Sequence, residues 1–544
     1  MQYYHFPKNT YFVTSEVNKT FEEILAMTEP EFRQWIIDVR AKIVEIWDTH
    51  GIPPRPGYTA DEIVEQFDSL FEFKPHKMFV KDELSGGLCI RNTHNKLGNA
   101  CNSWFPTMEK TKIDYGGKNS KPRSIYDFMK EDDLLEKYMP YGRRHFKRDS
   151  FYAYSQCITL ADGLPGRPGV KIDNAVDWIE KFDSQANKDT YGFWLQEKDA
   201  ESEYTGYNED LIGKEFLSLT YDEVDKGLKS GVIPQLAISN IIFSDPTGSR
   251  FLIRLYEKKT KIFPVGLKSF RISVCQSAVN FPPPIAKAIW ERYTEEFKSD
   301  KEVIVWDPSS GWGGRIVGAM SVKDDRKILY LGTDPNPDHI IHPTGQSYTD
   351  VDGIKEYPYT KYDDVATFIN KETMRGASLD PSTNCWRVWS KGSEVIQFDH
   401  DFQQYKGKVS VVFTSPPYFG KEQYSEDKNQ SCHKFAGYQE WKNGFLYETL
   451  KTAYEWLRPG GYILWNISDI SMGKDVLPLE KDSCDIMESF GMKHIETLRM
   501  ILGQMPGSGR TKKDSNGEII STNRNSARIN GTTFRYEPIW VYKK

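Results

Sequence analysis

Residues 303–334, VIVWDPSSGWGGRIVGAMSVKDDRKILYLGTD, decide the fold of this chain. The β-branched run 303–306 predicts a buried strand, and the turn 307–315 that follows it contains three glycines and opens a helix. A second hydrophobic run, 328–331, leads into Gly332-Thr333-Asp334. A strand, a tight turn, a helix and a second strand are typical of the first unit of a doubly wound α/β sheet.

Further runs of the same kind extend this sheet toward the C-terminus. They are residues 386–389, 409–413 and 462–465. Residues 442–457 place apolar side chains at helical spacing, and Pro459-Gly460-Gly461 ends this helix in a turn. Five buried strands in this order predict a doubly wound, Rossmann-like α/β domain, with unrelated strands of a β-rich domain as the alternative.

The length of 544 residues indicates several domains, because one domain usually has about 100–200 residues. Residues 1–150 are predicted to be mainly helical, with helices at 21–44 and 59–70. Residues 151–279 mix strand-like runs with acidic helices and predict an α+β region whose role the pattern does not reveal. The doubly wound domain then takes up residues 280–544.

The glycine-rich turn after the first strand predicts a nucleotide-like cofactor. Glycines let the backbone approach a ligand closely, and the start of the following helix offers unpaired N–H groups. Asp334 stands 23 residues after Gly311, at the end of the next strand, where doubly wound folds hold a ribose hydroxyl. The chain has no Walker lysine at this turn, which argues against ATP. An ordinary tight turn is the alternative interpretation.

A second motif, Ser415-Pro416-Pro417-Tyr418, follows the strand 409–413 and lies at the carboxyl edge of the sheet, where such folds bind ligands. This tetrapeptide argues against NAD as the cofactor. Two prolines fix the backbone and remove two donors, so that carbonyl oxygens remain to accept hydrogen bonds from an amino group. Tyr418 supplies an aromatic face on which a base taken out of its helix could stack.

Together the two motifs resemble the DNA amino-methyltransferases, class I enzymes that methylate the exocyclic nitrogen of a base. The resemblance covers residues 280–544 and includes Asn280-Phe281-Pro282-Pro283-Pro284 before the glycine turn and residues 536–541 as the last strand. It implies S-adenosyl-L-methionine as the cofactor. The cofactor-binding residues that it implies are Phe281, Asp307, Pro308, Ser310, Gly311, Gly313, Asp334 and Ser393.

The resemblance also implies roles within this set. Asp307, Gly311 and Gly313 would line the methionine part of the cofactor, and Asp334 would bind its ribose. Ser393 follows Gly392 where the family often has Gly-Asp near the adenine, so serine is a departure there. Trp312 would pack either on the cofactor or in the core.

The catalytic residues that the resemblance implies are Ser415, Pro416, Pro417 and Tyr418. Ser415 and the Pro416 carbonyl would hold the target amine. Serine at the first position, with a threonine before it, resembles the cytosine-N4 members, whereas adenine-N6 members more often have Asp or Asn. Cytosine N4 is therefore the favoured target and adenine N6 the alternative. A methyltransferase of RNA or of a protein amide, and a non-catalytic nucleic-acid-binding protein, remain as other classes.

Charge restricts where DNA could be held. With 71 basic and 77 acidic residues the chain has a net charge of −6, so contact with double-stranded DNA requires local basic patches. Two stretches mix basic residues with aromatic or flexible ones, and solvated basic loops are the alternative interpretation of both. The predicted DNA-binding residues are Arg143, Arg144, Lys147 and Arg148 in the first stretch and Arg510, Lys512 and Lys513 in the second.

Other classes of protein are excluded by what the sequence lacks. No run of 18 or more apolar residues could span a membrane, and the first residues do not resemble a signal peptide. None of the seven cysteines forms a C-x-x-C pair, so no zinc or other metal is expected. The sequence therefore predicts a cytoplasmic protein, and the resemblance implies a bacterial or phage-infected cell. Its recognition sequence, its oligomeric state and a restriction nuclease as partner are left open.

Overall fold

The computed structural model describes residues 17–19, 23, 27–51, 58–92, 94, 97–113, 122–130, 278–323, 326–350, 353–378, 385–472, 475–502, 512–513, 519–520 and 525–544. Nearly all of the predicted α+β region 151–279 lies outside these residues. The same holds for the predicted boundary at residue 150.

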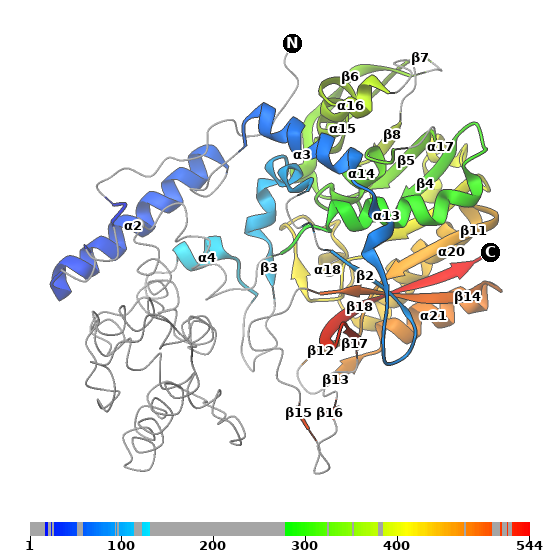
Figure 1. Cartoon of the computed structure of the whole chain (residues 1–544). Helices are drawn as coiled ribbons and strands as arrows, with labels where there is room; N and C mark the ends of the chain where they lie inside the picture. Colours follow the sequence, from blue (N-terminus) through cyan, green and yellow to red (C-terminus); the bar gives the residue numbers. More distant parts are fainter. Residues whose placement is uncertain are drawn as a thin grey trace, which may run out of the picture.

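One large sheet dominates the part of the chain that the structure describes (Figure 1). Its order is β1-β2-β14-β18-β11-β9-β4-β5-β8. In that order the strands are Phe79–Lys81, Leu88–Arg91, Lys493–Ile501, Thr532–Lys543, Leu457–Asn466, Val409–Thr414, Val303–Asp307, Ile328–Thr333 and Trp386–Trp389. The five strands predicted from the sequence are therefore β4, β5, β8, β9 and β11, and they are neighbours in the sheet.

Strand direction agrees with a doubly wound fold. β4 pairs in parallel with both β5 and β9, β5 with β8, and β9 with β11. β18 is inserted antiparallel between β11 and β14. Because parallel strands end at one edge, the chain leaves β4, β5 and β9 on the same side of the sheet. The predicted doubly wound α/β fold is confirmed.

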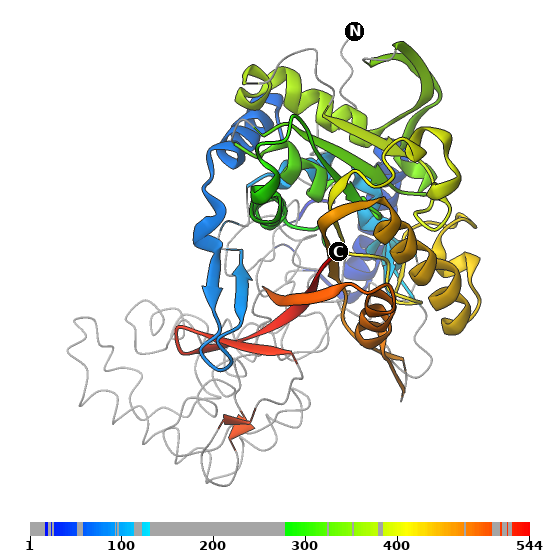
Figure 2. The ribbon, with the colours of Figure 1, turned by 90° about the vertical axis from the view of Figure 1, so that its right-hand side faces the viewer.

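Helices cover both faces of this sheet (Figure 2). Helices α13 (Pro283–Thr294), α14 (Gly314–Met320) and α15 (Lys361–Glu372) pack on one face and contribute to one hydrophobic core. Helices α17 (His400–Gln403), α20 (Glu448–Trp456) and α21 (Leu479–Ser489) contribute to a second core on the other face. Burial on both faces explains why the central strands are continuous hydrophobic runs rather than alternating ones.

The N-terminal region adds two strands to the sheet, which the sequence did not predict. β1 and β2 form an antiparallel hairpin, and β2 pairs in parallel with β14, with Cys89 opposite Arg499. Strands of only three and four residues are too short to give a recognisable alternation. Part of the predicted helical region 1–150 is thus continuous with the large sheet.

Lys287 shows how tightly the same region packs on α13. Lys287 lies within this helix and is fully buried, although lysine is usually exposed. Its ammonium group donates to the carbonyl oxygens of Leu70, Phe71 and Phe73, at 2.8, 2.6 and 2.8 Å. These carbonyls lie at the C-terminal end of α3 (Ala60–Glu72), where a helix leaves its last carbonyls unpaired and favours a cation. Burial lowers the Lys287 pKa to about 8.

Other helices follow the sequence with shifted bounds. α2 spans Glu29–His50, and α3 begins after Thr59, whose side chain caps it. The predicted helix 442–457 begins with a π-helical turn, Lys442–Tyr447, before α20. The Pro459-Gly460-Gly461 turn forms an irregularity within β11, with Gly460 at a φ of 79°.

The remaining described elements are short or lie outside the large sheet. The helices are α4 (Ile125–Lys130), α16 (Met374–Ala377), α18 (Ser431–Lys434) and α19 (Tyr438–Trp441), with 3₁₀ turns at Pro75–Met78, Asn99–Ser103, Pro106–Lys110, Glu295–Phe297, Pro337–His339 and Ile396–Phe398. The strands are β3 (Lys112–Ile113), β6 (Ile340–Asp350), β7 (Gly353–Thr360), β10 (Glu422–Gln423), β12 (Ile470–Met472), β13 (Asp475–Leu477), β15 (Lys512–Lys513), β16 (Ile519–Ile520) and β17 (Ser526–Ile529). Among the described helices, none is long and apolar enough to cross a membrane.

Candidate active site

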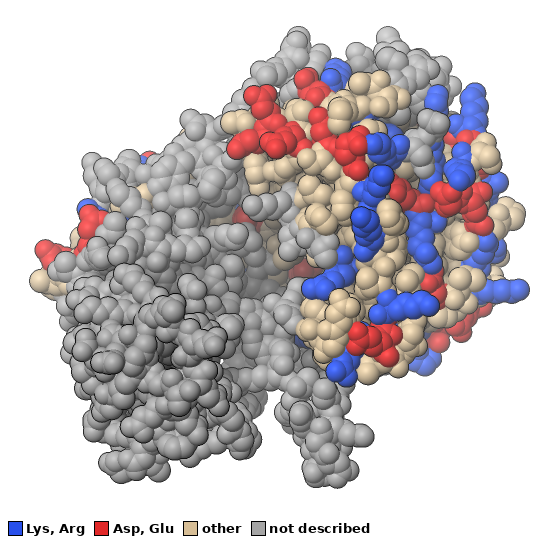
Figure 3. All heavy atoms as spheres, viewed as in Figure 1, with Lys and Arg blue, Asp and Glu red and all other residues tan. Residues whose placement is uncertain are grey.

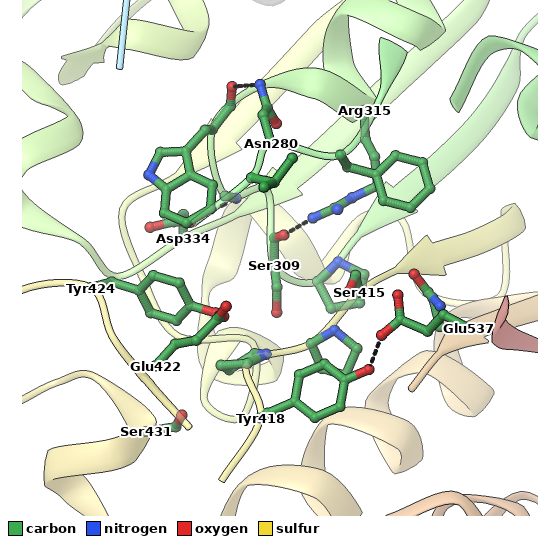
Figure 4. A pocket seen from close by; sticks show the side chains of 18 of the residues that line it. Asn280, Ser309, Arg315, Asp334, Ser415, Tyr418, Glu422, Tyr424, Ser431 and Glu537 are labelled. Atoms are coloured by element: carbon green, nitrogen blue, oxygen red, sulfur yellow. Dashed lines mark hydrogen bonds between the residues drawn. The ribbon is translucent and has the colours of Figure 1, made fainter. Parts of the chain in front are cut away.

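A cavity of about 620 Å³ lies at the carboxyl edge of the sheet, between the glycine loop (residues 307–315) and the tetrapeptide (Figure 4). This volume falls in the range of about 300–1,000 Å³ that is usual for ligand sites. The predicted site residues that line it are Phe281, Pro308, Gly311, Asp334, Ser393, Ser415, Pro416, Pro417 and Tyr418. Asp307, Ser310 and Gly313 do not line it.

The glycine loop turns where its glycines allow it. Gly311 has a φ of 57° and Gly313 a φ of 77°, in the left-handed region that other residues rarely adopt. A Cβ atom on Gly313 would come within 2.7 Å of the Phe105 ring. Gly311 faces the cavity, whereas Gly313 packs against Phe105 and shapes the turn from outside the cavity.

Asp334 lies at the end of β5 and connects this strand to the loop. Its carboxylate accepts backbone N–H groups from Gly311 and Asn336, each at 2.9 Å, and His339 Nδ1 lies 3.4 Å away. A carboxylate has about four lone-pair positions, so it can accept further hydrogen bonds from ribose hydroxyls. Its place in the cavity wall suits the predicted role.

Asp307 is fully buried beneath the loop rather than exposed to the cavity. Its carboxylate forms an ion pair with Arg315 (2.8 Å) and accepts hydrogen bonds from the hydroxyls of Tyr330 (2.7 Å) and Thr414 (2.8 Å). An unpaired buried carboxylate would be costly, and these three donors remove that cost. Asp307 therefore lies behind the cavity wall, and its predicted contact with the cofactor stays a prediction.

The same network reaches the tetrapeptide. Thr414 is the residue before Ser415, and its hydroxyl both donates to Asp307 and accepts the Ser309 backbone N–H at 3.2 Å. Ser310 is buried as well, and its hydroxyl lies 3.3 Å from that of Tyr330. The cofactor loop and the tetrapeptide are therefore fixed relative to each other through Asp307.

Within the tetrapeptide, the two side chains differ in how they are held. The Ser415 hydroxyl makes no hydrogen bond to any residue that the structure describes, and it faces the cavity. The Tyr418 hydroxyl donates to Glu537 and accepts the Ser468 backbone N–H at 3.0 Å. Burial raises the pKa of the Tyr418 hydroxyl and that of the Glu537 carboxyl above their usual values. Ser415 is available to a ligand, whereas the Tyr418 ring is fixed.

Ser393 lies where the resemblance places a residue near the adenine. It is buried, and its hydroxyl is 2.9 Å from that of Thr449. The neighbouring Glu394 also lines the cavity and pairs with Lys434 at 2.6 Å. Ser393 and the acidic Glu394 thus lie next to each other in the cavity wall.

Several lining residues were not predicted as site residues. Trp312 lines the cavity, with its ring against Tyr424 at 5.4 Å between centroids and an angle of 65°. Glu422, Tyr424, Asn466 and Glu537 also line it. These last four residues lie outside the two motifs, so spacing within a motif could not reveal them. For Glu537 alone the sequence contains an indication, because it is the acid in residues 536–541, which resemble the last strand of the family.

The predicted basic residues are not placed by the structure. Arg143, Arg144, Lys147, Arg148 and Arg510 lie outside the described residues, and only the backbone of Lys512 and Lys513 is described. Within the described residues, no cluster of three or more His, Cys, Asp or Glu side chains could hold a metal ion.

Comparison with known proteins bears on the C-terminal part of the chain. The DNA methylase family of N6/N4 methyltransferases matches residues 409–544. No curated protein sequence matches the chain. A DNA modification methylase from Thermus thermophilus is 20% identical over 26% of this chain and 46% of its own, with a TM-score of 0.16. This chain therefore spans about half the length of that protein.

Two further solved structures are similar at low identity. The complex of the Thermus thermophilus protein with S-adenosyl-L-methionine is 19% identical over 26% of this chain and 48% of its own, with a TM-score of 0.16. A class I S-adenosylmethionine-dependent methyltransferase from Listeria monocytogenes is 12% identical over 56% and 78%, with a TM-score of 0.24. The similarity to the DNA methylase family of N6/N4 methyltransferases thus lies in residues 409–544, which include β9, the tetrapeptide, β11, β14 and β18.

Proposed function

We propose that this chain transfers a methyl group from S-adenosyl-L-methionine to the exocyclic amino group of a base in DNA, with cytosine N4 as the favoured atom. The observation that carries the proposal is that one cavity joins Gly311 and Asp334 on one side to Ser415 and Pro416 on the other. A donor and an acceptor bound at the two sides would meet within it. Direct transfer between them depends on positioning and electrostatics.

The residues present fit the cofactor. Asp334 would accept hydrogen bonds from the ribose, Ser393 and Glu394 would face the adenine, and Phe281 and Gly311 would face the methionine end. Asn466 also borders the cavity, and its buried Oδ1 has no hydrogen-bond partner among the described residues. When bound, S-adenosylmethionine supplies an electrophilic methyl group.

The tetrapeptide would activate the amine. The lone pair of an aromatic amine is delocalised into the ring, which makes the amine a poor nucleophile. Ser415 Oγ and the Pro416 carbonyl can each accept one of its N–H groups and favour a tetrahedral nitrogen, whose lone pair then points at the methyl group. Pro416 and Pro417 have no N–H group to compete for these acceptors.

Tyr418 would hold the base. Because its hydroxyl is bonded to Glu537 and to the Ser468 backbone, its ring presents a fixed face to the cavity. A base inside a duplex cannot reach such a cavity, so the target nucleotide would have to be rotated out of the stack. Stacking of a base on an aromatic ring stabilises binding by about 1–3 kcal/mol.

The experiment that tests this function is incubation of the full chain with labelled S-adenosylmethionine and mixed DNA or RNA, followed by nucleoside analysis. We expect label in DNA as N4-methylcytosine. Label in N6-methyladenine would keep the DNA methyltransferase and change the base. Label in RNA or protein alone would overturn the proposal. Serine as the first residue of the tetrapeptide favours cytosine by resemblance, whereas a carboxylate would be the stronger acceptor for either base.

We expect Asp334→Ala to weaken S-adenosylmethionine affinity by about one to two decades. Hydrogen bonds to a charged group contribute about 1.5–3 kcal/mol, and about 1.4 kcal/mol corresponds to a factor of ten. Isothermal titration calorimetry measures this change. Asp338→Ala is the matched control, because Asp338 is exposed in the same segment and does not line the cavity. Unchanged affinity in Asp334→Ala would refute the ribose assignment.

We expect simultaneous replacement of Arg143, Arg144, Lys147 and Arg148 by alanine to flatten the dependence of log DNA affinity on log salt. Each lost phosphate contact removes about 0.9 from the slope. The described face in Figure 3 carries Lys and Arg interspersed with Asp and Glu, so it offers no uniform basic surface in that view. A variant with four exposed lysines replaced, at 298, 391, 406 and 481, controls for net charge. If the quadruple arginine and lysine variant keeps the parental salt dependence and only the control variant changes it, these four residues form a solvated surface and do not contact DNA.

A further inference from the structure

Glu422 faces the cavity from β10, seven residues after Ser415. The Tyr424 hydroxyl donates to its Oε2 atom, and its Oε1 atom has no hydrogen-bond partner among the described residues. Figure 4 shows Glu422 and Ser309 pointing into the opening that Ser415 and Tyr418 border from the other side. The Glu422 carboxyl group thus borders the cavity in which the two proposed ligands would meet.

Two contacts hold Glu422 in this position. β10 pairs with β3, which places Glu422 opposite Ile113 of the N-terminal region. Tyr424 packs its ring against Trp312 of the glycine loop. The carboxylate is therefore fixed by elements on both sides of the cavity and does not depend on a free loop for its position.

Methyl transfer to an amine requires a proton acceptor, and the tetrapeptide does not supply one. The nitrogen that gains a methyl group carries a positive charge until it loses one proton. A serine hydroxyl and a peptide carbonyl accept hydrogen bonds but do not hold a proton at neutral pH. Family members with a carboxylate as the first residue would have an acceptor there, whereas this chain has Ser415.

We propose, on the basis of the proposed function, that Glu422 is the proton acceptor of the methyl transfer. The nitrogen lone pair forms the bond to the methyl carbon, and the methyl–sulfur bond breaks with its electron pair passing to sulfur. The N–H bond then breaks, its electron pair remains on nitrogen, and the proton moves to Oε1 of Glu422. The resulting carboxylic acid releases the proton to water when the products leave.

Glu537 is the other carboxyl beside the tetrapeptide, and it is less suited to this role. It already accepts the Tyr418 hydroxyl, and burial raises its pKa. Burial also raises the pKa of Glu422, while the Tyr424 hydrogen bond and Lys421 lower it. Both acids therefore favour the neutral form more than an exposed glutamate does. The Glu537 carboxyl also meets the Asn466 side chain, whereas Tyr424 is the one side-chain donor to Glu422 among the described residues.

The pH dependence of the methylation rate would reflect every titratable group near Glu422. Those that face it or its partner Tyr424 are Lys421, Tyr418, Cys432, Asp334 and Glu537. On the paired strand, Lys112 is bound to Glu426 at 2.8 Å. Tyr418 and Cys432 have raised pKa values, Cys432 to about 11, so neither titrates in the acid range.

The test is the single-turnover rate of DNA methylation by the full chain as a function of pH. A base must be ionised to act, so the parental rate should fall as pH drops through the Glu422 pKa. We expect Glu422→Gln to lower the rate at neutral pH about tenfold and to remove this acid limb, since glutamine accepts a hydrogen bond but no proton and water must replace it. Glu426→Gln, an exposed acid of the same segment, should retain the parental rate and profile.

Tyr424→Phe separates proton acceptance from a merely structural role. It keeps the carboxylate but removes the hydrogen bond that lowers the Glu422 pKa, so the acid limb should move to higher pH. Parental rate and profile in Glu422→Gln, with cofactor and DNA affinities intact, would overturn the inference and leave the proposed function standing. Absence of methylation by the parental chain would overturn the proposed function and the inference with it.

Discussion

Ser415→Ala is expected to lower the single-turnover rate of DNA methylation about a hundredfold while the affinities for S-adenosylmethionine and DNA stay near parental. Its hydroxyl has no partner among the described residues, so it is free to accept the amine N–H. That hydrogen bond matters most when the nitrogen becomes tetrahedral. Loss of one preorganised partner of a reacting group commonly costs about 10²–10³ in rate.

A change confined to the rate is what distinguishes this role. An interaction made mainly in the transition state lowers the chemical step without weakening ground-state binding. Rapid-quench methylation and fluorescence binding with the same duplex measure the two separately. Ser378→Ala, which alters an exposed serine outside the cavity, is the matched control. A parental rate in Ser415→Ala would sink the assignment of the tetrapeptide as the catalytic motif.

The sequence predicts the sheet well because each central strand is a continuous hydrophobic run. Burial on both faces leaves few polar positions, and β4, β5 and β9 are recognisable as strands for that reason. The loops between them carry the glycines and prolines that fix the turn and the tetrapeptide. Both motifs therefore fall on one cavity, as expected for the carboxyl edge of a parallel sheet.

What the sequence could not predict depends on contacts between distant segments. Lys287 resembles the polar side of an amphipathic helix, and its burial is explained by the carbonyls of residues 70, 71 and 73 together with Glu291, 3.7 Å away. Glu422 and Glu537 lie in no motif, and their approach to the tetrapeptide follows from the pairing of β10 with β3 and from the insertion of β18. Neither pairing leaves a signal at fixed spacing.

Asp307 shows that spacing within a motif does not predict the direction in which a side chain points. Its position at the end of β4 suggests a ligand contact, and the motif alone cannot tell whether the carboxylate turns to the cavity or to the core. Arg315 decides this, because a buried guanidinium on the helix that follows needs a carboxylate partner. The Asp307 carboxylate thus stabilises the glycine loop, and through its hydrogen bond with Thr414 it also positions the tetrapeptide.

Asp307→Ala is expected to destabilise the folded chain by about 3–5 kcal/mol, the usual effect of removing one partner of a buried ion pair. It leaves the Arg315 guanidinium uncompensated, and the hydroxyls of Tyr330 and Thr414 lose their acceptor. Thr414→Val removes one hydrogen bond to the same carboxylate and the hydroxyl that accepts the Ser309 N–H, so at about 0.5–1.5 kcal/mol for each bond it should cost less than Asp307→Ala. Urea unfolding followed by tryptophan fluorescence compares the two.

A double variant tests the cause of this loss. Asp307→Asn combined with Arg315→Met removes both charges, so it should be more stable than the sum of the single effects predicts. Additive losses would show that Asp307 and Arg315 act independently and that the ion pair does not hold the loop. If the ion pair does hold the loop, Thr414→Val should also lower the rate of methyl transfer under conditions in which the variant is folded. The reason is that Thr414 connects the Asp307 carboxylate to Ser415, the residue that faces the amine.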